Sequence, residues 1–272
     1  MREAQRNDQL KKSLLDIIGK YHEINDVLIG RVDTLVETIV DDNQLCDLKG
    51  IMSWFYELKD QIDFSVRPIP LNDVVGWGPN RGTGNIEHEK GEFFSVIGVR
   101  VSTTIRERKG GWDQPMIDQG TKSSLVGLLR KPINGIPHYL IEAKAEPGNF
   151  GTLQLSPTLQ VTFSNLLRAH EGRKPNYAEY FEELAGTDGE YVDVLKEWTE
   201  IPGKIRYRQW LPEDGGRFFK KRILFKIVDL PPDKEVPLRS DNFIWLTLFQ
   251  MKELLCCDNI INPHLRSLIS CL

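Results

Sequence analysis

Four polar stretches of the sequence mix amides, carboxylates, hydroxyls and cations with apolar or aromatic residues. They occupy residues 85–94, 111–115, 142–149 and 154–162. This combination is typical of the walls of a ligand pocket, where a few polar groups among apolar ones orient the bound molecule. We therefore expect the chemistry of this chain to reside in these stretches.

The last of these stretches alternates polar and apolar residues. A single strand, with its period of two, would place five polar side chains on one face: Gln154, Ser156, Thr158, Gln160 and Thr162. An uncharged wall of hydrogen-bonding groups suits a sugar or a nucleobase. The alternative is that this face of an antiparallel strand simply meets solvent.

Several familiar catalytic and cofactor motifs are absent from the sequence. The glycines of 82–84 lack the third glycine of a dinucleotide fingerprint, and no phosphate-binding P-loop or G-x-S-x-G nucleophile elbow occurs. His88 and Glu89 begin a zinc motif, but Glu92 stands where the second histidine would be. We therefore expect neither a dinucleotide cofactor nor a bound metal.

The composition is that of an ordinary globular chain of 272 residues and 31.3 kDa. Hydrophobic residues make up 40% and charged residues 27%, which excludes a disordered or integral membrane protein. The 35 basic and 39 acidic residues give a net charge of −4, so no overall positive field holds nucleic acid or an anionic membrane. Four cysteines without metal-type spacing and a polar N-terminal segment predict a reducing, cytoplasmic location.

Two helical patterns dominate the first 65 residues, and they must position whatever follows. Apolar residues recur in steps of four and three from Leu10 to Leu28 and, after a break at Arg31, at Leu35, which predicts a heptad-like helix. A second periodic stretch begins near Leu45, after the polar turn 41–43. We expect a helical hairpin that either packs on its own chain or pairs two subunits.

Short strands are predicted after the Pro-rich segment 67–70, where the helical pattern ends. Runs of β-favouring residues occupy 93–104, 124–129, 138–144, 154–162 and 223–228. Helices are expected again near 177–183 and from Leu246 to Leu255, with Thr247 as an N-cap. This order favours an α+β fold with a mixed sheet. We divide the chain into the hairpin, 1–65, and a functional domain, 66–272.

Eight motifs occur in order between about Pro68 and the end of the sequence: IEHEKGEFF, GWDQP, EAKAEPGN, LQLSPTLQVT, SN, NYAEYF, GGRFFKKR and DNFIWLTLFQMKELL. In this order the chain strongly resembles the NDP-hexose 2,3-dehydratase family over roughly three-quarters of its length. The resemblance implies a Nudix-like mixed sheet flanked by helices. The clustered R-E-x-x-E-E pattern of the Nudix metal site is missing.

The resemblance also implies a reaction, the removal of water across C2 and C3 of a nucleotide-linked 4-keto-6-deoxyhexose, most plausibly carried on dTDP. The ketone at C4 acidifies the C3 proton, and the resulting enolate expels the C2 hydroxyl group. Glu146 is the candidate base, Lys144 the candidate partner of the enolate or a phosphate, and His88 the candidate proton donor. Such a lyase requires no redox cofactor. The alternatives are a surface Lys144–Glu146 ion pair and a structural histidine.

Further residues are assigned to substrate binding. Trp112 is expected to stack on the base or sugar and Gln114 to hydrogen-bond it, while Arg217 and Arg222, in the densest basic run, would hold the diphosphate. The other candidate contacts are Asn149, Gln154, Ser156, Thr158, Gln160 and Tyr177, the last being with Tyr180 a second candidate acid. Asp241 and Asn242 are assigned to a structural turn. Each candidate has a structural alternative, such as a buried tryptophan or a solvated basic strand.

The number of domain copies departs from the family pattern. Family members carry two tandem copies in a chain nearly twice as long, whereas this sequence has one. We therefore expect a homodimer that binds a nucleotide-linked hexose, with neither nucleic acid nor membrane as a partner. Two other functions stay open: a non-catalytic nucleotide-sugar-binding protein or partner subunit, and a keto-sugar isomerase or epimerase that never expels the hydroxyl group.

Overall fold

The computed structural model describes residues 2–40, 45–91, 93–104, 110–120, 122–166, 173–181 and 204–272. Its helices are α1 (Arg2–Ile18), α2 (Asp26–Ile39), α3 (Leu48–Gln61), α4 (Phe163–Leu166), α5 (Leu248–Leu254) and α6 (Pro263–Ser270), with 3-10 turns at Leu71–Asp73 and Ala178–Tyr180. Its strands are β1 (Trp77–Pro79), β2 (Ile86–His88), β3 (Ser95–Val101), β4 (Trp112–Asp118), β5 (Lys122–Ile133), β6 (Ile136–Ala145), β7 (Leu153–Pro157), β8 (Leu159–Thr162), β9 (Lys204–Pro212), β10 (Arg222–Asp229) and β11 (Phe243–Leu246). The α+β prediction is confirmed.

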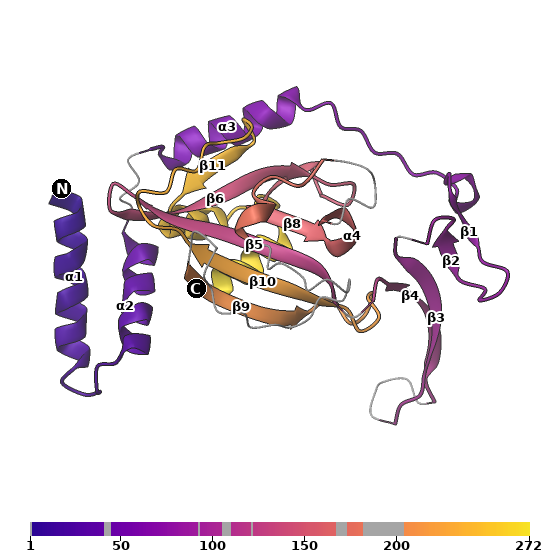
Figure 1. Cartoon of the computed structure of the whole chain (residues 1–272), viewed down its shortest axis with the longest axis horizontal. Helices are drawn as coiled ribbons and strands as arrows, with labels where there is room; N and C mark the ends of the chain where they lie inside the picture. The colour runs from indigo at the N-terminus through magenta and orange to yellow at the C-terminus, as the bar shows by residue number, and fades with distance from the viewer. Residues whose placement is uncertain are drawn as a thin grey trace.

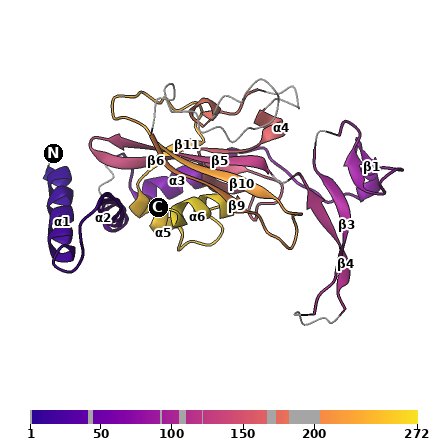
Figure 2. The same ribbon diagram turned by 60° about the horizontal axis from the view of Figure 1, so that its bottom comes forward.

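A mixed seven-stranded sheet carries the core of the molecule. Its main path runs β11-β6-β5-β10-β9, with β5 and β10 parallel and the other pairs antiparallel. Helices α3, α5 and α6 cover one face, and α4 lies on the other (Figure 2). Cover on both faces explains why β10 is buried at six consecutive positions, from Ile223 to Val228, instead of alternating between buried and exposed residues.

The large sheet splits open at one end. Strands β5 and β6 pair only over 130–133 and 136–139. Beyond that point β8 pairs with β5, and β7 pairs with β6. Thr158 stands where the strands diverge, because its hydroxyl donates to the Leu140 carbonyl at 2.5 Å and accepts from the Leu129 amide at 2.9 Å. The predicted single strand over 154–162 is therefore wrong: it is two strands, and its polar residues do not form one continuous face.

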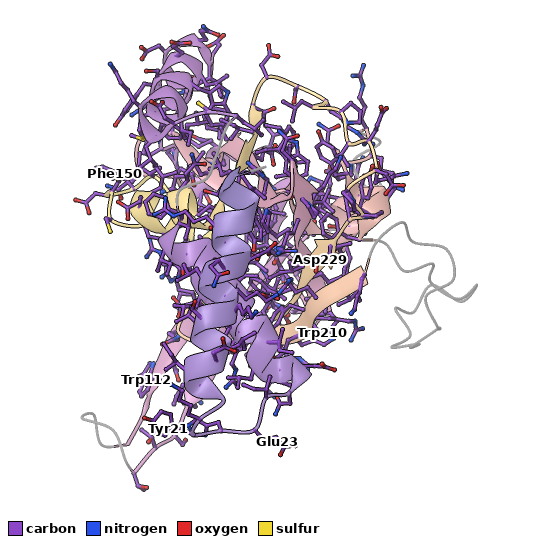
Figure 3. The ribbon with its side chains drawn as sticks, turned by 90° about the vertical axis from the view of Figure 1, so that its left-hand side faces the viewer. Tyr21, Glu23, Trp112, Phe150, Trp210 and Asp229 are labelled. Carbon is purple, nitrogen blue, oxygen red and sulfur yellow. The ribbon has the colours of Figure 1, made fainter. Side chains whose placement is uncertain are left out.

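The first two helices form a hairpin that stands beside the large sheet (Figure 1). The predicted continuous helix from Leu10 to Leu35 is wrong, because α1 ends at Ile18 and the Asn25 side chain caps α2 by accepting from the Leu28 amide at 2.9 Å. Tyr21 lies on the connecting loop with 79% of its surface exposed (Figure 3). Glycine at position 19, immediately after α1, favours the break.

Helix α3 belongs to the core of the large sheet and does not pair with α1. Ile51 and Phe55 are fully buried in the cluster that also holds residues of α5 and α6. The chain division at residue 65 stays a prediction, and so does the likeness to the Nudix fold. None of the helices in the described part of the chain is long and apolar enough to cross a membrane.

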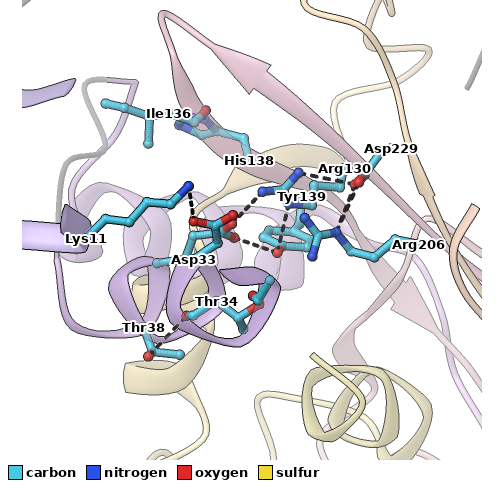
Figure 4. Close-up of polar contacts among 12 residues, drawn as sticks. Lys11, Asp33, Thr34, Thr38, Arg130, Ile136, His138, Tyr139, Arg206 and Asp229 are labelled. Carbon is cyan, nitrogen blue, oxygen red and sulfur yellow. Dashed lines mark hydrogen bonds and ion pairs between the residues drawn. The ribbon is translucent and has the colours of Figure 1, made fainter. Parts of the chain in front are cut away.

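A network of charged residues fastens α2 to the large sheet (Figure 4). The Arg130 guanidinium on β5 pairs with Glu37 of α2 and with Asp229, 3.2 Å away at the end of β10. The Tyr139 hydroxyl donates to the same Glu37 carboxylate at 2.8 Å. Although desolvation opposes it, the combined carboxylates raise the pKa of Arg130.

The four strands β1–β4 form a second, smaller antiparallel sheet that projects from the large one (Figures 1 and 2). It meets the large sheet at the turn between β9 and β10. There the Ile117 amide donates to the Arg217 carbonyl at 2.8 Å, and the Phe219 amide donates to the Ile117 carbonyl at 2.8 Å. The small sheet therefore extends from the end of the large sheet at which β5 and β10 begin.

Candidate active site

Two carboxylates and an ammonium group gather where β6 ends. Glu142 and Lys144 alternate on the strand, so they share one face, and Glu146 follows its last residue. The Asn149 side chain closes the turn after Glu146 by donating to the carbonyls of Lys144 and Thr152, both at 3.1 Å. The turn thereby fixes the direction in which the chain leaves β6.

Gln160 on β8 joins Lys144 and Glu146 across the split in the sheet. The Lys144 ammonium donates to the Gln160 carbonyl at 2.9 Å and lies 3.8 Å from the Glu146 carboxylate. The Gln160 side-chain amide donates to both carboxylate oxygens of Glu146, at 3.0 and 3.2 Å. The Glu146 carboxylate is thus held by a charged group and a neutral one, from two strands.

The other end of the Gln160 amide is also anchored. Its oxygen accepts from the Asn262 side chain at 2.8 Å and from the Ser156 hydroxyl at 3.1 Å. Asn262 is the N-cap of α6, and its side-chain oxygen accepts from the Leu265 amide at 2.8 Å. Since an amide oxygen cannot donate, these contacts fix which way Gln160 points, with its NH2 group toward Glu146.

A pocket of about 330 Å³ opens beside this cluster. Glu142 and Lys144 line it, and so do Thr158 and Gln160 at and after the β7–β8 junction. Its remaining wall consists of Leu159, Val161, Asn165, Arg173, Pro175, Asn176 and Phe243. The volume is that of a small-molecule site, and the lining combines charged, amide and apolar groups as ligand pockets do.

Glu142 is the carboxylate that faces this pocket. Burial raises the pKa of its side chain, and Lys144 only partly offsets the effect. The Asn242 side chain donates to the Glu142 carboxylate at 3.3 Å and to the Ala143 carbonyl at 3.1 Å. A carboxyl group with a raised pKa that lies next to a cation is a candidate for proton transfer.

His264, in the first turn of α6, lies within electrostatic reach of the cluster. Its charge interacts with Lys144 and Glu146 on one side and with Glu213 and Lys221 on the other, and burial lowers its pKa. Lys221 pairs with Glu213 at 3.6 Å and contacts the Phe218 ring. Among the described residues, no three histidine, cysteine, aspartate or glutamate side chains lie close enough together to hold a metal ion.

The model of the NDP-hexose 2,3-dehydratase family matches residues 48–272. The chain belongs to this family. Its curated relatives include three proteins named dTDP-4-dehydro-6-deoxy-alpha-D-glucopyranose 2,3-dehydratase. They come from Streptomyces violaceoruber (33% identity over 84% of this chain), Saccharopolyspora spinosa (37% over 80%) and Amycolatopsis orientalis (38% over 82%).

The chain spans less than half the length of these relatives. The aligned part covers 47%, 41% and 44% of their respective lengths. The match to the family model begins at Leu48, the first residue of α3, and therefore includes all of the large sheet and leaves out α1 and α2. The family assignment thus rests on the part of the molecule that contains the cluster and the pocket.

In this 2,3-dehydratase family member, the structure brings together four of the predicted site residues. Lys144, Glu146, Ser156 and Gln160 form one connected network. Thr158 lines the pocket, but its hydroxyl is occupied by two backbone groups. Gln154 points elsewhere and donates to the Asn259 carbonyl at 3.3 Å, and Asn149 serves the turn.

His88 lies apart from this network, on β2 of the small sheet. Its ring packs against Trp77 and Phe93, with ring centroids 5.5 and 4.5 Å away, and its Nδ1 accepts from the Lys90 amide at 3.2 Å. In the small sheet β2 lies beyond β3, on the side away from β4 and the large sheet (Figure 1). Within one chain, the structure therefore does not join the predicted proton donor to the predicted base.

Trp112, Gln114 and Arg217 meet at the junction of the two sheets. The Trp112 indole donates to the Gln114 side chain at 2.6 Å, and Gln114 donates to the Gly216 carbonyl at 3.0 Å. Arg217 is exposed and pairs with Asp214 at 2.7 Å. The group holds the small sheet against the β9–β10 turn, and its role in substrate binding stays a prediction.

Two more predicted substrate contacts have other partners. The buried Tyr177 hydroxyl donates to the Pro237 carbonyl and accepts from the Arg239 amide, both at 2.9 Å. The Arg222 guanidinium lies over the Trp210 ring, 5.8 Å from its centroid. The Tyr177 hydroxyl therefore holds the loop before β11. The Arg222 side chain, at the start of β10, covers the ring of Trp210 on β9.

Sequence reasoning placed Glu142 in the expected pocket stretch 142–149 and kept it only as an alternative base, and it gave Asn242 and Asn262 no role in the site. The alternation of Glu142, Lys144 and Glu146 was a usable signal for the first, because every second residue of a strand shares a face. Asn242 and Asn262 lie about 100 residues along the chain from their partners. No local pattern marks them as anything except residues of a turn and a helix cap.

Proposed function

We propose that this protein removes water across C2 and C3 of a nucleotide-linked 4-keto-6-deoxyhexose, the dTDP-linked glucose derivative. The product would be the 2-deoxy-3,4-diketo sugar nucleotide. The observation that carries the proposal is that Glu142 and Lys144 line one pocket at the split of the sheet, with Glu146 paired to Lys144. Membership of the family and the printed activity of the relatives supply the substrate class.

In the proposed reaction Glu146 removes the C3 proton. Its carboxylate is oriented by the Gln160 amide, so little reorganisation is needed when the proton arrives. The charge that develops on the C4 oxygen is stabilised by the Lys144 ammonium, which reaches the pocket wall. A positioned proton-transfer group of this kind contributes about 10²- to 10⁴-fold in rate.

The pocket also offers groups for the rest of the substrate. Asn165 and Asn176 present amides that suit sugar hydroxyl groups, and Arg173 presents a guanidinium that suits a phosphate. The predicted diphosphate contacts of Arg217 and Arg222 remain part of the proposal, because both lie at the same end of the large sheet. A nucleotide sugar would then extend from the pocket toward the β9–β10 turn.

We further propose that two copies of the chain associate. The chain spans less than half the length of its curated relatives, and a homodimer would supply the mass that they carry in one chain. A cytoplasmic location completes the proposal. It is supported by the four cysteines, all of which are free thiols.

The test of the function is incubation of the purified protein with dTDP-4-keto-6-deoxyglucose in D₂O, followed by NMR and mass analysis of the sugar. We expect loss of water, with deuterium incorporated from the solvent. Deuterium exchange at C3 without loss of water would instead identify an isomerase or epimerase. Binding of the nucleotide sugar with neither change would identify a non-catalytic binding protein.

A further inference from the structure

Loss of the C2 hydroxyl group requires a proton donor, and the mechanism above assigns none within reach of Lys144 and Glu146. Hydroxide is a poor leaving group, so an acid at this position is worth about 10²- to 10⁴-fold in rate. The sequence suggested His88, but that ring lies in the small sheet and is enclosed by Trp77 and Phe93. The pocket itself contains one carboxyl group that the mechanism does not use, that of Glu142.

We propose that Glu142 is the general acid that protonates the C2 hydroxyl group as it leaves. The assignment rests on the proposed function and adds a second proton-transfer residue to it. Glu142 lines the pocket two residues before Lys144 on the same face of β6. Glu146 follows Lys144 by two more residues, just after the end of β6, and its carboxylate lies 3.8 Å from the Lys144 ammonium that lines the pocket.

The surroundings of Glu142 suit an acid better than those of Glu146 do. Pocket residues Phe243 and Leu159 are apolar and buried, and burial favours the protonated form of the carboxyl group. The Asn242 amide donates to one Glu142 oxygen and leaves the other for the substrate. By contrast, the single NH2 group of Gln160 donates to both oxygens of Glu146. Two carboxyl groups in environments this different are the usual basis for separate acid and base roles.

The proton and electron balance of the step closes with these two residues. Glu146 takes the C3 proton, and the C3–H electron pair forms the enolate with the C4 carbonyl group. As the enolate collapses, the C2–C3 double bond forms, the C2–O bond breaks, and the oxygen leaves as water with the proton of Glu142. The immediate product is the C2–C3 enol, which becomes the 3,4-diketo sugar when C2 takes up a proton from solvent and the C3 hydroxyl group releases one. Glu146 ends protonated and Glu142 ionised, and proton exchange with solvent restores both.

A different leaving group distinguishes protonation of the C2 oxygen from removal of the C3 proton. A substrate analogue with fluorine in place of the C2 hydroxyl group releases fluoride, which needs no protonation to leave. With Glu142→Gln we expect loss of water from the natural substrate to fall by about 100-fold or more. Fluoride release from the analogue and deuterium exchange at C3 should stay close to wild type, because both depend on Glu146. The conservative variant Glu142→Asp, which keeps the acid, should recover part of the water loss.

Two control variants complete the experiment. Glu146→Gln should lose both reactions, since both begin with removal of the C3 proton. Glu253→Gln carries the same chemical change on the exposed face of α5 and should leave both unchanged.

The acid role would be overturned if Glu142→Gln, still folded by its thermal unfolding curve, slowed fluoride release as much as water loss. It would also be overturned if Glu142→Gln slowed neither, or if His88→Gln showed the selective loss of water elimination. A wild-type protein that eliminates neither water nor fluoride would overturn the proposed function itself, which is a different result from any of these.

Discussion

Gln160 uses the two ends of one side-chain amide for two different partners. Its NH2 group holds Glu146, and its oxygen is held by Asn262 and Ser156. Asn262 can be altered without loss of its helix cap, because aspartate keeps the oxygen that accepts from the Leu265 amide. The variant Asn262→Asp therefore keeps the cap oxygen and replaces the NH2 group that faces Gln160 with a carboxylate oxygen.

We expect Asn262→Asp to lower the rate of water loss by about tenfold, equivalent to about 1.4 kcal/mol. The new carboxylate favours the flipped Gln160 amide, whose oxygen would then face Glu146. Steady-state turnover measures the effect, and circular dichroism checks that α6 remains folded. Asn25→Asp makes the same change at the N-cap of α2 and should leave turnover unaltered. Equal losses in the two variants would rule out the positioning role.

The buried carboxyl group of Glu142 predicts a pH-dependent stability. Its pKa in the folded protein is raised above the ordinary value of 4.5 by burial, with Lys144 opposing and Glu146 reinforcing the shift. The folded state therefore binds this proton more tightly, and the carboxylate destabilises the fold as the pH rises from about 4.5 through the folded pKa. Over this pH range the free energy of unfolding of wild type should fall relative to that of Glu142→Gln. Above the folded pKa the difference between the two should stay constant. Parallel curves would show that the group is not buried as described.

The residues of the candidate site were predictable where local spacing carried the information. Lys144 and Glu146 stand out because they end a strand before a Pro-Gly turn, and the structure places them together. Asn262 was not predictable, because its partner Gln160 is 102 residues away and only the packing of α6 on β7 brings them together. The continuous polar face predicted through Thr158 is wrong because the alternation crosses the junction of two strands, whereas its role as a substrate contact stays a prediction.

At the scale of helices and strands, the sequence predicted the buried central strands of the large sheet and missed strands at the edges of the two sheets. The apolar runs that became β5, β6 and β10 were predicted with slightly shorter bounds, and Thr247 caps α5 in a complete capping box with Gln250. Strands β4, β9 and β11 were missed because their residues are mixed in polarity or few in number. The helix predicted near 177–183 is a short 3-10 turn in its described part, Ala178–Tyr180.

The attachment of α2 to the large sheet is an element-scale feature with a measurable stability. The Arg130 and Glu37 side chains are each only 10% exposed, so removing one leaves the other short of a partner in a low-dielectric site. We expect Glu37→Ala to lower the free energy of unfolding by about 3 kcal/mol in urea denaturation. Asp33 lies on α2 as Glu37 does and forms a more exposed pair with Lys11 of α1, so Asp33→Ala should cost less than about 1 kcal/mol. Similar costs for the two variants would show that the Arg130 network does not fasten α2.

At the scale of the whole molecule, association is the open structural question that the chain length raises. Helices α1 and α2 lie outside the part that matches the family model and expose several large apolar side chains, among them Ile17, Val27 and Ile39. Light scattering should give about 63 kDa, twice the 31.3 kDa of one chain. A monomer of about 31 kDa that still turns over substrate would rule out the proposed homodimer.

The most direct test of the central claim, that the end of β6 is the reactive centre, is the turnover of Glu146→Gln on dTDP-4-keto-6-deoxyglucose measured beside its affinity for the nucleotide sugar. If Glu146 is the base, water loss should fall by about 10²-fold or more, while the dissociation constant for the nucleotide sugar should stay near that of wild type. Glu253→Gln should match wild type in both. Unchanged water loss by Glu146→Gln would contradict the account and move the base to another carboxylate.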